Sequence, residues 1–213
     1  MISYSCLGQQ KLQFKIDGLN DTTVFLARYF GEKLYYADTT ISKNETVIFN
    51  KKVLVGGIYA VVCPNSKYFE FIVADEDVLM ETDINDFNGK MKVIKSENNK
   101  IFYDYIKFLG SMKEKMMSIN PEQQSEKRKE LDILVKKFQK ENILANQNLL
   151  GAKVLAMSID PEIPESIINN DSLRYRYYLD HYWDHIDVTD NRIVHTPVYH
   201  KKLDFFFKKM IPQ

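Results

Sequence analysis

The residues best suited to chemistry are the histidines, which cluster near the C-terminal end: His181, His185, His195 and His200. His181 and His185 lie four residues apart within a predicted helix over 173–185, so both imidazoles would share one face, as in a two-histidine metal site. Nearby carboxylates could complete the site: Asp180, Asp184 and Asp187. However, Tyr182 follows His181 where zinc proteases have their general-base glutamate. We therefore favour a packing helix with hydrogen-bonding histidines, and predict no bound metal and no cofactor.

The two cysteines, Cys6 and Cys63, do not form a Cys-x-x-Cys pair, so this chain cannot carry out dithiol redox chemistry alone. Cys63 ends the apolar run 59–63, which is typical of a strand, and we expect its thiol to be buried and inert. There is no Gly-x-Ser-x-Gly elbow for a nucleophile and no glycine-rich phosphate loop. Gly56 and Gly57 are interpreted as a turn that enters a strand. We predict no catalytic residue and no enzyme activity for this chain.

The charge balance narrows the range of partners. Lysine plus arginine number 29, as do aspartate plus glutamate, so no net field attracts phosphates or anionic lipids. The segment 174–178 mixes arginines with tyrosines, as grooves for single-stranded nucleic acid do. On a helix these side chains point in different directions, so we favour tyrosines that pack in the core and arginines that face solvent. No apolar run approaches the roughly 18 residues that a membrane span needs. We predict neither a nucleic-acid partner nor a membrane span.

Residues 1–8 are apolar and small, and polar residues follow at Gln9 and Gln10. We interpret residues 1–10 as a signal-peptide remnant whose charged start lies upstream of Met1, or as a disordered N-terminus. A lipoprotein cleaved before Cys6 is a further alternative.

Residues 11–95 show the alternation of half-buried strands, as in Leu12, Phe14 and Ile16. Eight short apolar segments follow one another, with turn residues between them, and no long helical pattern interrupts them. This predicts an antiparallel sandwich or barrel, and of the two we favour an antiparallel β-sandwich domain over 11–95. We expect the strands near these positions: 12–16, 24–29, 34–38, 47–49, 57–62, 69–73, 78–82 and 92–94.

The period changes to that of a helix after Ser96, and we place the domain boundary there. Phe102 and Ile106 begin an apolar stripe that continues to Met116. The whole predicted fold is α+β, with a helical domain of about five helices over 96–213. We expect the two domains to pack together. The five helices are expected after Ser96, after Pro121, and over 149–157, 173–185 and 199–210.

Three adjacent aromatics, Phe205, Phe206 and Phe207, lie in the last predicted helix. They cannot all face one core, so at least one is expected to meet another element, chain or domain.

Two segments of the second half carry a family resemblance. Residues 178–187, which read Tyr-Leu-Asp-His-Tyr-Trp-Asp-His-Ile-Asp, and residues 192–206 resemble a domain of unknown function in Bacteroidetes envelope proteins. In that family this domain directly precedes a TlpA/ResA-like thioredoxin domain. Residues 31–39 and 57–59, with Glu97-Asn98, resemble the β-sandwich domain that commonly comes first. The two resemblances together cover nearly the whole chain.

The resemblance implies a periplasmic or envelope-anchored protein with a role near thiol–disulfide exchange. The catalytic Cys-x-x-Cys of that family lies downstream and has no matching position here, so no catalytic residue is carried over. His181 and His200 fall inside the family motif without a known role.

Three functions remain as alternatives. The first is a non-catalytic accessory region of an envelope thiol–disulfide oxidoreductase, which recruits a partner or substrate or forms a homodimer. Its partner would be a downstream thioredoxin domain or another envelope protein. The second is a free-standing envelope module that binds a peptide or a glycan, and the third is a metal-dependent enzyme that uses His181 and His185. A reading frame that continues past Gln213 into a Cys-x-x-Cys would favour the first.

Overall fold

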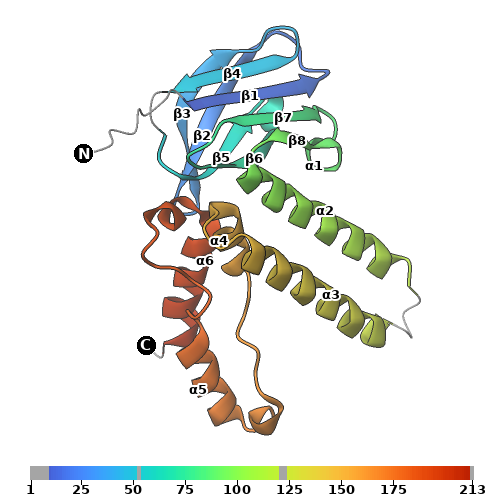
Figure 1. Ribbon diagram of the computed structural model, residues 1–213, viewed down its shortest axis with the longest axis vertical. Coiled ribbons are helices and arrows are strands. Elements are labelled where there is room, and N and C mark those ends of the chain that lie inside the picture. The colour runs from blue at the N-terminus through green and yellow to red at the C-terminus, as the bar shows by residue number, and fades with distance from the viewer. Residues whose placement is uncertain (1–9, 52–53, 120–123, 212–213) are drawn as a thin grey trace.

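The computed structural model describes residues 10–51, 54–119 and 124–211, and its fold is α+β, as the sequence predicts. The strands come first and the long helices follow (Figure 1). The segment that was interpreted as a signal-peptide remnant, with Cys6, lies outside the described residues apart from Gln10. The strands are β1 (Gln10–Asp17), β2 (Thr23–Phe30), β3 (Lys33–Ile41), β4 (Thr46–Lys51), β5 (Gly57–Val62), β6 (Tyr68–Val73), β7 (Val78–Asp83) and β8 (Lys92–Lys95).

The eight strands form two four-stranded sheets with the orders β4-β1-β7-β8 and β3-β2-β5-β6. Alternate apolar side chains of both sheets meet in one core, as expected for a sandwich. Phe14 of β1, for example, contacts Phe69 and Phe71 of β6, with ring centroids 5.5 and 4.8 Å apart. The inward-facing positions of the strands therefore hold the sheets together.

One pairing differs from the all-antiparallel sandwich that the sequence predicts. β1 pairs in parallel with β7, with Leu12 opposite Val78 and Ile16 opposite Thr82. Alternation along a strand shows which side chains face the core, but a parallel and an antiparallel neighbour satisfy it equally well. The prediction of a purely antiparallel sandwich was therefore wrong at this one pair, while the positions of the strands were correct.

Within the described part of the chain, five α-helices follow residue 96, in agreement with the prediction of about five. The predicted helix over 173–185 is shorter than expected, because α5 ends at His181 and tight turns follow. None of the described helices is long and apolar enough to cross a membrane. A short helix in the strand region is α1 (Phe87–Lys90), and the later ones are α2 (Glu97–Met117), α3 (Gln124–Ala145), α4 (Leu150–Ala156), α5 (Asp171–His181) and α6 (Pro197–Phe205), with 3-10 helices at Glu165–Ile167 and Asn191–His195 and a π-helical turn at Phe206–Met210.

The helical region packs against the sheet that contains β2, β5 and β6. A second apolar core joins Ile58 and Ile72 of that sheet to Leu150 of α4 and Ile193 of the 3-10 helix. The hairpin of α2 and α3 extends away from the sandwich, and α5 and α6 lie together on the other side of the helical region (Figure 1). The start of α2 lies against β6, the edge strand of this sheet, and the candidate site is found there.

Candidate functional site

β6 is the last strand of its sheet, so one side of its backbone has no neighbouring strand among the described residues. Helix α2 covers part of this open edge. The side chain of Asn99 accepts a hydrogen bond from the Ile72 N–H (2.7 Å) and donates one to the Ile72 carbonyl (2.8 Å). The Tyr103 hydroxyl donates to the Glu70 carbonyl over 2.6 Å. These side chains satisfy backbone groups that another strand would otherwise pair with.

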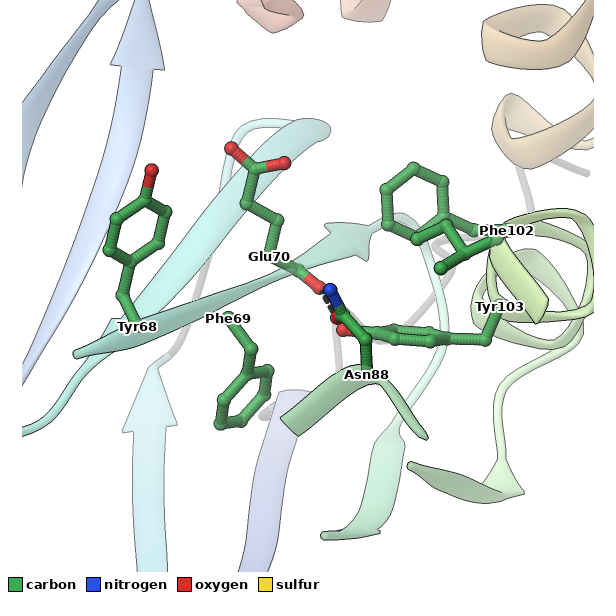
Figure 2. A pocket seen from close by; sticks show the side chains of 7 residues that line it. Tyr68, Phe69, Glu70, Asn88, Phe102 and Tyr103 are labelled. Carbon is green, nitrogen blue, oxygen red and sulfur yellow. Dashed lines mark hydrogen bonds between the residues drawn. The ribbon is translucent and has the colours of Figure 1, made fainter. Parts of the chain in front are cut away.

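The edge is open beyond the part that α2 covers. The N–H and carbonyl of Ile72 both point away from β5, towards α2. Backbone groups of every second residue in a strand point to the same side, so the N–H of Glu70 and the backbone groups of Tyr68 also point to this open edge. A hollow of about 270 Å³ lies here, between β6, α1 and α2 (Figure 2). Pockets for drug-sized ligands usually enclose ~300–1,000 Å³, so this one suits a single side chain better. It is lined by Tyr68, Phe69, Glu70, Asn88, Phe102, Tyr103 and Ile106.

Of the described residues that line the hollow, only Glu70 is charged. Its side chain projects from β6, and in the view of Figure 2 its carboxylate lies between the side chains of Tyr68 and Phe102. Oxygen Oε1 accepts a hydrogen bond from the Tyr29 hydroxyl. Burial raises the pKa of Tyr29, and the hydrogen bond to Glu70 raises it further, so this hydroxyl keeps its proton and remains a donor. No lysine or arginine among the described residues forms an ion pair with Glu70.

The Cys63 thiol is buried, with 4% of the residue exposed, so the burial that the sequence predicts is confirmed. Burial raises the pKa of Cys63 to about 11. At neutral pH the sulfur is therefore protonated and shielded, whereas thiol–disulfide exchange needs an accessible thiolate. Cys63 follows the end of β5, and its N–H donates to the Lys67 carbonyl over 2.8 Å.

The structure does not bring His181 and His185 onto one helical face, because α5 ends at His181. Its ring Nδ1 lies 2.6 Å from the Asp184 carboxylate, and His185 is exposed in the turn that follows. His200 Nε2 lies 2.8 Å from the Val194 carbonyl. Among the described residues no three His, Cys, Asp or Glu side chains are grouped so that they could hold a metal ion. The geometry on which the metal hypothesis depended is absent from this segment.

The segment 192–206, which carried the sequence resemblance, holds the helical region against the sandwich. A Cβ added to Gly56 would lie 2.7 Å from Arg192, and one added to Gly57 would lie 2.5 Å from His195. Asp190 binds Arg192 (2.7 Å) and Lys153 of α4 (2.7 Å). The hydrogen bonds from Arg192 and then Lys153 hold the pKa of Asp190 far below its usual range. These residues have a structural role, and the paired glycines are the sequence signal for this close approach.

The three C-terminal phenylalanines divide as the sequence predicts. Phe206 packs against Tyr182 and Trp183, with centroids 5.5 and 5.1 Å away. Phe205 and Phe207 are 47% and 58% exposed.

Sequence reasoning missed the hollow beside β6. It assigned Phe102 and Ile106 to the apolar stripe of a helix, and it treated the segment 69–73 as an ordinary strand. No local pattern in the sequence shows that this strand lies at an edge or that α2 leaves part of it uncovered.

A comparison with known protein families gives a match in the helical region. Residues 117–213 match a family described as Domain of unknown function (DUF5106). This range includes α3 to α6 and the segment that docks on the sandwich. It excludes β6, and of α2 it includes only the last residue. Neither the curated proteins nor the solved structures gave a significant match.

Proposed function

We propose that this chain is a non-catalytic binding module that recruits a polypeptide, as the accessory region of an envelope thiol–disulfide oxidoreductase. The observation that carries the binding function is the uncovered section of β6, where backbone groups of Tyr68 and Glu70 border a hollow with aromatic walls. An extended peptide can add to such an edge as a further strand, with main-chain hydrogen bonds for affinity and side-chain pockets for specificity.

The chemistry of the aromatic walls supports a polypeptide ligand. Tyr68 is 49% exposed, so a ligand can reach its ring. Tyrosine rings at binding surfaces supply large contact areas at a low entropic cost. Asn88 adds an amide that can both donate and accept hydrogen bonds, which suits a peptide backbone.

The state of the Cys63 thiol supports a function in binding, with the redox step carried out elsewhere. Because Cys63 is buried and its pKa is raised to about 11, the redox step of such an oxidoreductase would need a thiol pair outside this chain. The proposed role of this chain is to hold a disulfide-containing polypeptide in an extended form near that pair. The link to an oxidoreductase rests on the sequence resemblance of residues 178–187 and 192–206.

The binding function is tested with a permanently unfolded polypeptide, such as reduced and carboxymethylated α-lactalbumin. Isothermal titration calorimetry should show saturable binding to the purified chain. Tyr68→Ala should weaken this binding by roughly tenfold, because aromatic anchors at interfaces contribute about 1–2 kcal/mol or more.

Tyr35→Ala is the matched control, because Tyr35 is 50% exposed but lies on β3, at the opposite edge of the same sheet. The affinity of this variant for the unfolded polypeptide should equal that of the unchanged chain. The proposal fails if the unfolded polypeptide does not bind, or if the two variants bind it equally well.

A further inference from the structure

The hollow beside β6 combines an anion with aromatic rings. Glu70 supplies a half-buried carboxylate, and the rings of Tyr68 and Phe102 flank it (Figure 2). The Tyr29 hydroxyl donates to oxygen Oε1, and no group of the described residues donates a hydrogen bond to Oε2, which is therefore left for a ligand. Aromatic faces attract cations, and a guanidinium group both stacks on such rings and binds carboxylates.

The charge of the hollow selects among ligands. An acidic group would be repelled by Glu70, since no cation among the described residues forms an ion pair with it. An apolar group would cover the carboxylate without providing a hydrogen bond, and this costs free energy. A basic group satisfies both the carboxylate, by a charged hydrogen bond, and the rings, by a cation–π contact.

The geometry of the edge shows how a peptide would deliver this group. In a strand added beside β6, the residue opposite Glu70 has its Cβ about 4.5–5.5 Å from the Glu70 Cβ, on the same face of the sheet. A long basic side chain at that position reaches the carboxylate directly. The N–H of Glu70 and the backbone of Tyr68 are the groups with which the added strand would pair.

We propose that the hollow binds an arginine or lysine side chain of an extended polypeptide segment, with the cation on Glu70 between Tyr68 and Phe102. This inference rests on the proposed function, because it identifies the chemistry of the polypeptide that the β6 edge recruits. The occupant is a partner polypeptide that carries a basic residue between β-forming neighbours.

The test compares two peptides that differ only in charge: Ac-Thr-Val-Arg-Val-Thr-NH2 and the same peptide with citrulline in place of arginine. At low ionic strength, calorimetry should give the arginine peptide an affinity about tenfold higher, because a half-buried charge pair is only partly screened. Glu70→Gln should abolish this difference. The amide oxygen of the new side chain can still accept from the Tyr29 hydroxyl, so the fold is expected to persist.

Glu126→Gln provides the matched control, because Glu126 is exposed on α3 and the same charge is removed. This variant should keep the tenfold preference. Equal binding of both peptides to the unchanged chain, with both weakened by Tyr68→Ala, would overturn the basic-residue proposal and leave the binding function intact. Failure of both peptides and of unfolded α-lactalbumin to bind would overturn the two proposals together.

Discussion

At the scale of the residue, Asn99 takes the place of a neighbouring strand. Its side-chain amide contacts the N–H and carbonyl of Ile72, and its Nδ2 also donates to Ser96 Oγ over 2.8 Å. Ser96 in turn caps α2 by accepting from the Asn99 N–H over 3.0 Å. One buried side chain therefore joins the sandwich edge to the start of the first long helix.

Glu76 reinforces this junction from the turn between β6 and β7. It accepts hydrogen bonds from Ser96 Oγ (2.7 Å), Asn98 Nδ2 (2.7 Å) and the Glu97 N–H (3.0 Å). Burial alone would raise the pKa of Glu76, but the hydrogen bonds from Ser96 and Asn98 lower it on balance. A charged carboxylate at the N-terminus of α2 also interacts favourably with the helix dipole.

We expect Asn99→Ala to lower the free energy of unfolding by about 3 kcal/mol or more. Asn99 is fully buried, and its loss leaves the N–H and carbonyl of Ile72 without partners at about 1–3 kcal/mol each. Urea denaturation followed by circular dichroism measures the change. Asn169→Ala, at an exposed position, should stay within about 0.5 kcal/mol of the unchanged chain. Similar stabilities of the two variants would contradict this role of Asn99.

At the scale of the element, the 3-10 helix Asn191–His195 rests on the start of β5. Gly57 has φ +155°, and the β-carbon and carbonyl oxygen of His195 occupy the space that a side chain on Gly57 would need. Ile193 enters the second core beside Ile58. The absence of a side chain at position 57 allows this close approach between the two halves.

Gly57→Ala should therefore destabilise the protein by about 3 kcal/mol or more, because the new Cβ would lie 2.5 Å from the His195 Cβ and 2.8 Å from its carbonyl oxygen. Gly31→Ala is the control: Gly31 also has a positive φ, +65°, but has nothing within 4 Å of an added Cβ. Gly31→Ala should lower the free energy of unfolding by only about 1–2 kcal/mol, because backbone strain is its only cost. Thermal denaturation measures both changes. Equal losses of stability in the two variants would refute the role of Gly57 in the docking of the two halves.

The elements were predictable from the sequence where a local pattern determines them. Alternation located the eight strands, and the change of period at Ser96 located the start of α2, because both depend only on which face of an element is buried. The end of α5 was not predictable in this way. After His181, the chain turns so that Ile186 enters the core beside the sandwich, and this contact is not visible in local periodicity.

The candidate site shows the same limit more strongly. Tyr68 and Glu70 lie on a strand that the sequence located, and Phe102 lies on a helix that it also located. Their proximity depends on which strand forms the edge of the sheet and on where α2 crosses it. Both are determined by long-range pairing, about which alternation carries no information.

At the scale of the whole molecule, the proposed binding edge lies where the sandwich and the helical region meet. The second apolar core extends from Tyr29 and Ile72 of the sheet to Leu150 of α4, so the two regions support each other. The uncovered part of β6 lies beside the start of α2 and is held by residues of both regions (Figures 1 and 2). A polypeptide bound there would contact the sandwich and the helical region at once.

The amide hydrogen exchange of Glu70, measured by NMR with and without saturating Ac-Thr-Val-Arg-Val-Thr-NH2, tests recruitment at this edge most directly. An added strand would accept a hydrogen bond from the Glu70 N–H, so its exchange should slow by at least about tenfold. The Phe71 N–H already faces β5 and should change little. Exchange at Glu70 that stays unchanged while the peptide is bound would contradict the account.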